Sequence, residues 1–248
     1  MAKFLPAALL ASLLLAALPG DQAGARESAA QAGNVAAPPV FEAGHRVWLL
    51  AGDGTPARPL VKPPAGFFDI QPAISANGRL VAFFRFDGSV AAQKQCQRWP
   101  RRVGCRDLMV VRSDGRGLRR VLRLGGAASG ATSFSPDGRR LVFTDERFGL
   151  SVVNVDGTGR RELLRGPGTA GRGYAYDSPD WSAAGTKIAY VRAPLLSQWF
   201  PDAAKQELYL MNATGSGRRS VSRSCGGEFT PRFAPDSRTL LFISADAP

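Results

Sequence analysis

Few residues of the sequence have the types and spacing that chemistry needs. The sequence contains one histidine, His45, and neither a second His nor a Cys-x-x-Cys pair accompanies it. A zinc site takes three or four His, Cys or carboxylate ligands, so the sequence predicts no metal site and no cofactor. Asp177 and Asp180 are an acidic pair expected on an inner strand. They could bind a hard cation, but capping of the strand is the preferred interpretation.

The sequence also lacks the motifs of nucleophilic catalysis. No Gly-x-Ser-x-Gly segment occurs, and the stretch from Ser222 to Cys225 has no histidine near it in the sequence. A serine or cysteine nucleophile needs an adjacent base, so the sequence predicts a protein that is not an enzyme. An enzyme that uses the carboxylates of Asp177 and Asp180 is the alternative from another class.

Three cysteines, at positions 96, 105 and 225, are candidates for a disulfide. Cys96 and Cys105 flank a short loop and are the expected pair, although Cys225 could compete for either partner. A disulfide there would reduce the entropy that the loop loses on binding. The loop carries basic and aromatic residues that suit a partner-binding patch, namely Arg98, Trp99, Arg101 and Arg102.

Aromatic residues gather in two further predicted loops. Tyr174 and Tyr176 end a Gly-rich linker, and Trp199 and Phe200 lie in an insertion between two predicted strands. Aromatic side chains on a rigid rim anchor protein partners, so these four residues are candidates for ligand or partner binding. Packing of the same side chains on their own sheet is the alternative interpretation.

The charge of the chain favours an anionic partner. Its formal net charge is +12, and most of its basic residues are arginines. This excess predicts attraction to acidic proteins or peptides and to the anionic components of a cell envelope. The alternative is that a GC-rich genome sets the arginine content without any functional meaning.

The N-terminal segment predicts export. Lys3 precedes an apolar run from Phe4 to Leu18, which is shorter than the roughly 20 residues of a membrane span. Together with a small-residue site that ends at Ala25, it indicates a signal peptide over residues 1–25, with an uncleaved anchor as the alternative. Residues 26–45 are expected to form a flexible linker. We therefore expect a periplasmic or secreted protein with no later transmembrane segment and no nucleic-acid partner.

The remaining chain, residues 46–248, repeats one pattern. An extended segment, a polar turn and an apolar run follow one another at four places, and in three of them a second turn of the Asp-Gly type comes later. Asp, Asn and Gly favour hairpin turns because they bond to the local backbone or adopt positive φ. Each unit thus predicts four antiparallel strands, named a, b, c and d, at the period of a propeller blade. The first turns begin at Ser75, Ser135, Ser182 and Ala234.

The two ends of the repeat region carry half-units. Val47–Leu50 and Leu60–Val61 match strands c and d with no a or b before them, and the last copy finishes strand b at Ile243. Pairing of these halves would leave no open sheet edge, so we predict an all-β propeller of about four blades that is closed by a composite blade. A fragment of a larger propeller and an array completed by oligomerisation are the alternatives.

The repeat resembles the TolB-type, WD40-like β-propeller repeat. The copy with the fullest match runs from Ser133 to Leu164, and the resemblance covers about residues 46–245. It implies an exported TolB-like propeller that binds a protein or peptide. The periplasmic Tol-Pal component that names the family has an α/β domain before a six-bladed propeller, so the resemblance does not imply membership of that system. Related propellers also precede the hydrolase domain of serine peptidases, and a truncated or accessory domain of such an enzyme is the alternative function.

Strand alternation divides the predicted propeller into two faces. The a–b and c–d turns lie on one face, and the b–c loops and d–a linkers lie on the other. Insertions over residues 88–106 and 194–207 fall on the second face, so we expect partner binding there. The arginines after the Asp-Gly turns recur with the repeat and are expected to be solvated residues of the outer strand, with an anion-binding ring as the alternative: Arg119, Arg120, Arg160, Arg161, Arg218 and Arg219.

Overall fold

The computed structural model describes the part of the chain in which the repeats lie. Its described residues are 40–50, 54–88, 106–125, 131–167, 173–197, 200–201, 205–222 and 228–244. All described residues belong to one compact unit, residues 37–248. In this part of the chain no helix is long and apolar enough to cross a membrane.

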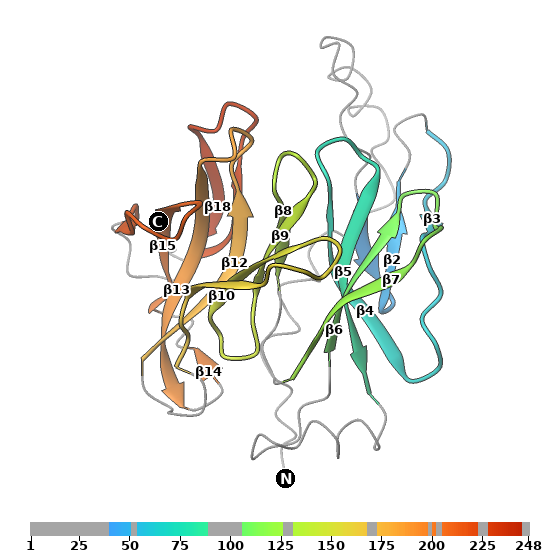
Figure 1. Cartoon of the computed structure of the whole chain (residues 1–248), viewed down its shortest axis with the longest axis horizontal. Coiled ribbons are helices and arrows are strands. Elements are labelled where there is room, and N and C mark those ends of the chain that lie inside the picture. The colour runs from blue at the N-terminus through green and yellow to red at the C-terminus, as the bar shows by residue number, and fades with distance from the viewer. Residues whose placement is uncertain are drawn as a thin grey trace. The chain divides into compact units, whose positions relative to one another are not determined.

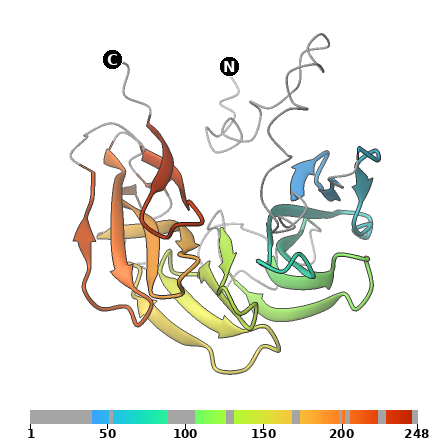
Figure 2. The same cartoon turned by 90° about the horizontal axis from the view of Figure 1, so that it is seen from above.

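The described residues form β-sheets that follow one another in chain order (Figures 1 and 2). Three of these sheets hold the full a–b–c–d set and are named blades 1 to 3. Blade 1 consists of β4 (Phe67–Ile74), β5 (Leu80–Asp87), β6 (Arg106–Arg112) and β7 (Arg119–Leu124). Blade 2 consists of β8 (Thr132–Phe134), β9 (Arg140–Thr144), β10 (Leu150–Asn154) and β11 (Arg161–Leu164). Blade 3 consists of β12 (Tyr174–Trp181), β13 (Lys187–Ser197), β15 (Glu207–Asn212) and β16 (Arg219–Ser220), and β14 (Phe200–Pro201) pairs with β13.

Two smaller sheets lie at the ends of this series. The N-terminal sheet consists of β1 (Val40–Ala43), β2 (Arg46–Leu49) and β3 (Arg58–Pro59). The C-terminal half-blade consists of β17 (Glu228–Phe233) and β18 (Leu240–Ser244). All pairs of neighbouring strands in the sheets are antiparallel, so the predicted all-β propeller architecture with four-stranded blades is confirmed.

The repeated turns form because their side chains cap the local backbone. In blade 2, the N–H of Gly138 donates to the carbonyl of Ser135 over 2.8 Å, and the Asp137 carboxylate accepts from the Ser135 hydroxyl and the Arg139 N–H. The hydrogen bond from Ser135 holds the pKa of Asp137 below its ordinary value. Gly138 has a φ of 69°, which glycine adopts without strain. The same closing hydrogen bond occurs in the other three predicted turns, at Gly78, Gly185 and Ser237.

The core lies between successive sheets. In β9, Leu141 and Phe143 pack toward blade 1, while Val142 packs toward blade 3. Successive residues of a strand point to opposite faces of the sheet, and both faces of each blade are buried against a neighbouring sheet. Strand b is therefore a continuous apolar run. Burial of such apolar surface contributes roughly 25 cal/mol per Å² to stability.

The predicted composite blade does not form. In the described residues β18 pairs with β17, and β2 pairs with β1 on the edge that a C-terminal strand was expected to take. Val40–Ala43, which the sequence assigned to the linker, supplies this strand through four residue pairs with β2. A strand that is close in sequence closes a short turn at little entropic cost, so it occupies the edge first. The open series agrees with the alternative expectation of a fragment of a larger propeller.

Candidate binding face

The two faces predicted for the propeller are present in the structure. The Arg79 carbonyl of the a–b turn accepts from the N–H of Ser113 in the c–d turn of blade 1, and Arg139 and Val155 make the same contact in blade 2. These turns therefore lie together, and we call this side the turn face. The opposite side, with the b–c loops and d–a linkers, is called the loop face.

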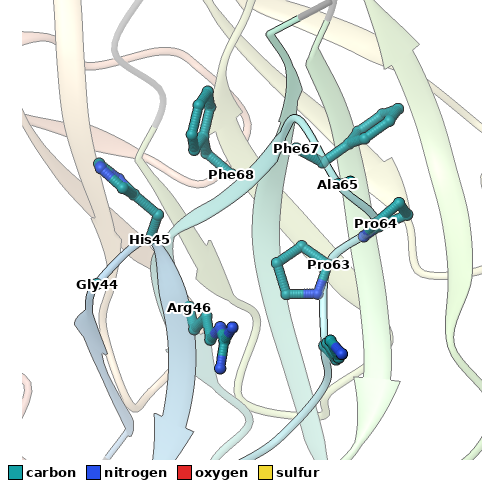
Figure 3. A pocket seen from close by; sticks show the side chains of 9 residues that line it. Gly44, His45, Arg46, Pro63, Pro64, Ala65, Phe67 and Phe68 are labelled. Atoms are coloured by element: carbon teal, nitrogen blue, oxygen red, sulfur yellow. The ribbon is translucent and has the colours of Figure 1, made fainter.

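The loop face contains a cleft at blade 1. Its cavity of about 570 Å³ lies between the β1–β2 turn, the linker after β3 and the start of β4 (Figure 3). The linker of the cleft follows strand d, and the β1–β2 turn precedes strand c, so both belong to the loop face. The lining residues are Gly44, His45, Arg46, Lys62, Pro63, Pro64, Ala65, Phe67 and Phe68.

Backbone contacts hold the rim of the cleft in place. The His45 carbonyl accepts from the N–H of Asp69 over 3.0 Å, which ties the β1–β2 turn to β4. His45 has a φ of 61°, which is a left-handed conformation. Gly44 before it has the same conformation, which costs a glycine less energy because it has no Cβ. The His45 and Phe68 side chains lie near each other (Figure 3), and their rings meet edge to face with centroids 4.9 Å apart. The imidazole therefore stands over the cleft beside an aromatic wall.

A buried ion pair fixes the wall behind the cleft. The Asp69 carboxylate, which is fully buried, accepts two hydrogen bonds from Arg85 over 2.6 and 2.7 Å. Such a two-point contact sets the geometry of both side chains, and the positive charge of Arg85 compensates the negative charge of Asp69. The charge that the cleft presents to solvent consequently comes from its own lining residues.

The lining of the cleft is basic. Arg46, Lys62 and His45 are exposed, and none of the lining residues is acidic. Among the described residues, no ion pair involves Arg46 or Lys62. Guanidinium and ammonium groups bind carboxylates through charge-assisted hydrogen bonds, and an adjacent aromatic wall suits an apolar side chain. The cleft can therefore bind an acidic segment that also carries an apolar residue.

A second cluster on the loop face lies at the end of blade 3. The guanidinium of Arg192 lies 4.2 Å from the Tyr174 ring centroid and 4.3 Å from that of Tyr209. The same group donates to Glu207 over 2.5 Å. Tyr174 stays 43% exposed, so one face of this stack is open to solvent. Desolvation raises the pKa of Tyr209, and the hydrogen bond between its hydroxyl and Glu207 acts in the same direction.

The sequence-predicted site residues have different positions in the structure. Tyr174, which was expected to end a Gly-rich linker, is the first residue of β12 and is 43% exposed at the loop-face end of that strand. Tyr176 is partly buried and packs edge-on against Tyr190, with centroids 5.9 Å apart, so it also supports its own blade. Phe200 belongs to β14, and Trp199 lies outside the described residues. The predicted loop also lies outside them, with Arg98, Trp99, Arg101, Arg102 and the expected Cys96–Cys105 pair.

The two inner-strand carboxylates make contacts between strands. The Asp180 carboxylate accepts from the N–H of Phe233 over 2.7 Å and from the Ser133 hydroxyl over 3.2 Å, and it thereby joins blade 3 to both neighbours. Asp177 accepts from the Thr144 hydroxyl over 2.6 Å. Burial raises the pKa of Asp180. These contacts support the preferred capping role. The described residues contain no group of three or more His, Cys, Asp or Glu side chains that could hold a metal ion.

The repeat arginines have a role that sequence reasoning missed. Arg58, Arg119 and Arg161 each follow the turn glycine by four residues, and each donates to a carbonyl in the next sheet's c–d turn. The acceptors are the carbonyls of Ser113, Val155 and Thr214. Arg58, Arg119 and Arg161 therefore join neighbouring sheets while remaining exposed on their outer strands. Their constant distance from the turn glycine is the signal that could have revealed this.

A buried arginine also escaped prediction. Arg106 at the start of β6 is fully buried and donates to the Thr144 carbonyl of blade 2 over 2.8 Å. Burial lowers its pKa to about 10, while the charges of Asp177 and Asp145 oppose the shift. It thus remains protonated at neutral pH and braces two blades beneath the loop face.

No family model matches the chain. Among curated proteins, it is 32% identical over 115 residues to the protein TolB homolog of Chlorobium chlorochromatii, a match that covers 46% of this chain and 23% of that protein. It is 28% identical over 150 residues to the protein TolB homolog of Chlorobium luteolum, which covers 58% of this chain and 30% of that protein. The chain thus spans less than a third of the length of these relatives.

Solved structures show the same fold. The crystal structure of TolB from Acinetobacter baumannii has a TM-score of 0.56 and 14% identity, and the match covers 79% of this chain and 42% of that chain. A structure of prolyl endopeptidases has a TM-score of 0.52 and 12% identity, covering 77% and 28% of the two chains. At these identities the likeness concerns the fold alone, since a propeller hosts many functions.

Proposed function

Because the repeats of this chain are β-propeller repeats of the TolB type, we propose that it is an exported, non-catalytic propeller that binds an acidic protein or peptide segment on its loop face. The predicted signal peptide supports a periplasmic or secreted location. Envelope proteins with acidic, extended segments are the class of partner that the charge favours. Neither nucleic acid nor a cofactor is part of this function.

The basic cleft at blade 1 is the observation that carries the proposal. Arg46 and Lys62 are exposed cations without an ion-pair partner in the described residues, and Phe68 adds an exposed aromatic wall. An interface gains affinity from such anchors when the rest of the surface is rigid. The Asp69–Arg85 pair and the His45–Asp69 contact supply that rigidity.

The stack at Tyr174 extends the same function to blade 3. Its open ring edge and the polar groups of Arg192 and Glu207 suit a second contact with an extended partner. Tyr176, Trp199 and Phe200 complete this part of the proposed surface. From the sequence, we also propose that Arg98, Trp99, Arg101 and Arg102, in the loop bracketed by Cys96 and Cys105, contribute to binding.

Binding rather than catalysis fits the chemistry of the described residues. The partly buried carboxylates Asp177 and Asp180 are engaged in contacts between strands. Prolines, Phe67, Phe68 and the cations Arg46 and Lys62 line the cleft with His45, and no acidic side chain is among the lining residues. The prolyl endopeptidase likeness is one of fold, so a role as an accessory domain of an enzyme gains no support from it.

Fluorescence anisotropy with charged peptides tests the proposal. The purified chain without residues 1–25 is titrated against a labelled peptide rich in Glu and Phe, and against the matched peptide with Lys in place of every Glu. We expect saturable binding of the acidic peptide alone, weakened by salt because exposed charges are screened within about 8 Å at physiological ionic strength. Equal affinity for both peptides would overturn the proposal.

A further inference from the structure

The first strands of four sheets place equivalent residues around one cavity. The position lies two residues before each a–b turn, and it holds Ala73 in β4, Ser133 in β8, Asp180 in β12 and Arg232 in β17. All four residues line a cavity of about 380 Å³, whose remaining lining residues are Val40, Pro72, Ile74 and Thr132. This cavity shares no lining residue with the cleft of the loop face, so a ligand bound there would add to the proposed function.

At two of these positions the side chain accepts a hydrogen bond from the next sheet. The Ser133 hydroxyl accepts from the N–H of Trp181 over 3.2 Å. The Asp180 carboxylate accepts from the N–H of Phe233 over 2.7 Å. Trp181 and Phe233 also hold equivalent positions, one residue before the a–b turn of their own sheet. The repeat thus uses a side-chain oxygen at this position to join one first strand to the next.

Ala73 has no oxygen in its side chain with which to make this contact. Its donor by equivalence is the N–H of Phe134 in β8. The next N–H along the strand, that of Ser135, faces β9 because it donates to the Arg140 carbonyl there. Alternation along an antiparallel strand therefore turns the Phe134 N–H away from β9. Among the described residues no acceptor for this N–H is found. Backbone donors in folded proteins are normally paired, so a ligand that supplies an acceptor here gains affinity.

Arg232 adds a positive charge to the lining of the cavity. Its side chain is 53% exposed, and its Nη1 donates to the Pro231 carbonyl over 3.1 Å and lies 3.8 Å from the Asp180 carboxylate. No contact of its Nε or Nη2 is found in the described part of the chain, and a guanidinium has five N–H donors. The Asp180 carboxylate is already compensated by this guanidinium and by hydrogen bonds from the Ser133 hydroxyl and the Phe233 N–H. The cavity therefore suits an acceptor with a negative charge.

We propose that this cavity binds a small carboxylate that carries a short apolar group. The carboxylate of the ligand accepts from the N–H of Phe134, in the same way as the Asp180 carboxylate accepts from the N–H of Phe233. The guanidinium of Arg232 attracts the charge of the ligand and donates to it. The apolar group packs on the apolar part of the lining, which consists of Val40, Pro72 and Ile74. A free carboxylic acid and the C-terminal end of a peptide share this chemistry.

Titration of the intact chain with isobutyrate, followed by amide NMR, tests the proposal, because the Phe134 amide reports its own hydrogen bond. We expect a saturable shift of this amide, with a dissociation constant on the order of 1 mM for so small a ligand. Isobutyramide, which has the same shape without the charge, should bind at least about tenfold more weakly. A short peptide that ends in valine, with a free or an amidated C-terminus, distinguishes the sources. Tighter binding of the free peptide than of isobutyrate identifies a peptide end, and weaker binding identifies a free acid.

Two variants test the named contacts. Arg232→Gln should weaken isobutyrate binding about tenfold, whereas Arg238→Gln, an exposed arginine of the same half-blade outside the cavity, is the matched control and should bind as the wild-type chain does. Ala73→Ser supplies the hydroxyl that Ser133 has one blade further on. It should weaken isobutyrate binding at least about tenfold without lowering the unfolding midpoint, because the new hydroxyl takes the N–H of Phe134. The proposal is overturned by the absence of a saturable shift, by equal binding of isobutyramide, or by unchanged affinity in Arg232→Gln or Ala73→Ser.

Discussion

Several charged residues of the turn face bond within the chain, whereas Arg46 and Lys62 in the loop-face cleft have no ion-pair partner among the described residues. Asp137 and Asp156 accept hydrogen bonds from their own turns, and Arg119 and Arg161 donate to the neighbouring blade. Arg46 and Lys62 line the cleft with no acid among its lining residues. The side chains of the turn face thus stabilise the fold, whereas those of the loop face are available to bind a partner. This difference is why we seek the partner site on the loop face.

The largest expected effect concerns the joints of the turn face. Gly157 has a φ of 93°, and a Cβ on it would lie 2.7 Å from the Val121 carbonyl. Gly157→Ala should lower the free energy of unfolding by about 3 kcal/mol through strain and a backbone clash. Gly54→Ala is the control, since Gly54 has a φ of 83° and open space around its Cβ. It should cost roughly 1 kcal/mol. Urea denaturation measures the free energy of unfolding of both variants. Equal losses of stability would contradict the close contact between Gly157 and the Val121 carbonyl.

Next in size is the loss of a repeat arginine. Arg161→Ala removes the hydrogen bond to the Thr214 carbonyl and should destabilise the chain by about 1 kcal/mol. Arg219→Ala should change stability by less than about 0.5 kcal/mol, because no such contact of Arg219 is found in the described residues. Denaturation midpoints measure both variants. A greater loss for Arg219→Ala would show that the arginines do not act through the next sheet's turn.

The pH dependence of Asp180 tests a contact inside the scaffold. Burial raises the pKa of this carboxyl above 3.8, so the folded state binds its proton more tightly than the unfolded state does. Its contribution is fully present below pH 3.8 and is lost as the pH rises through the folded pKa. Relative to Asp180→Asn, the wild-type chain should therefore lose stability as the pH rises from about 4. Thermal unfolding at several pH values measures this, and a difference that is constant with pH would contradict it.

The sequence predicted the blades better than their assembly because the turns are local. Ser135, Asp137 and Gly138 close their hairpin with contacts inside a few residues, and such chemistry is visible in the chain itself. The edge of β2 is taken by β1, which is close in the sequence, and the apolar pattern of Val47–Leu49 would suit the distant β18 as well; Val40–Ala43 was instead assigned to the linker. The composite blade was therefore predicted wrongly.

The candidate site shows the same limit. Tyr174 was predicted from its type and its place in a linker, and it lies exposed on the loop face. The cleft was missed because it joins His45, at the end of the assumed linker, to Lys62 after β3, and neither position is distinctive alone. Arg106 was missed because an arginine at the start of a strand normally predicts exposure, whereas here Thr144 and nearby carboxylates compensate for its burial.

Charge reversal in the cleft tests the central claim most directly. Arg46 and Lys62 are exposed, so the double variant Arg46→Glu, Lys62→Glu should keep the unfolding midpoint of the wild-type chain. Its affinity for the labelled peptide rich in Glu and Phe should fall at least about tenfold, because hydrogen bonds to charged groups contribute roughly 1.5–3 kcal/mol. The pair Arg116→Glu, Arg238→Glu on the turn face is the control and should bind as the wild-type chain does. Equal affinities of the two double variants would contradict binding at the loop face.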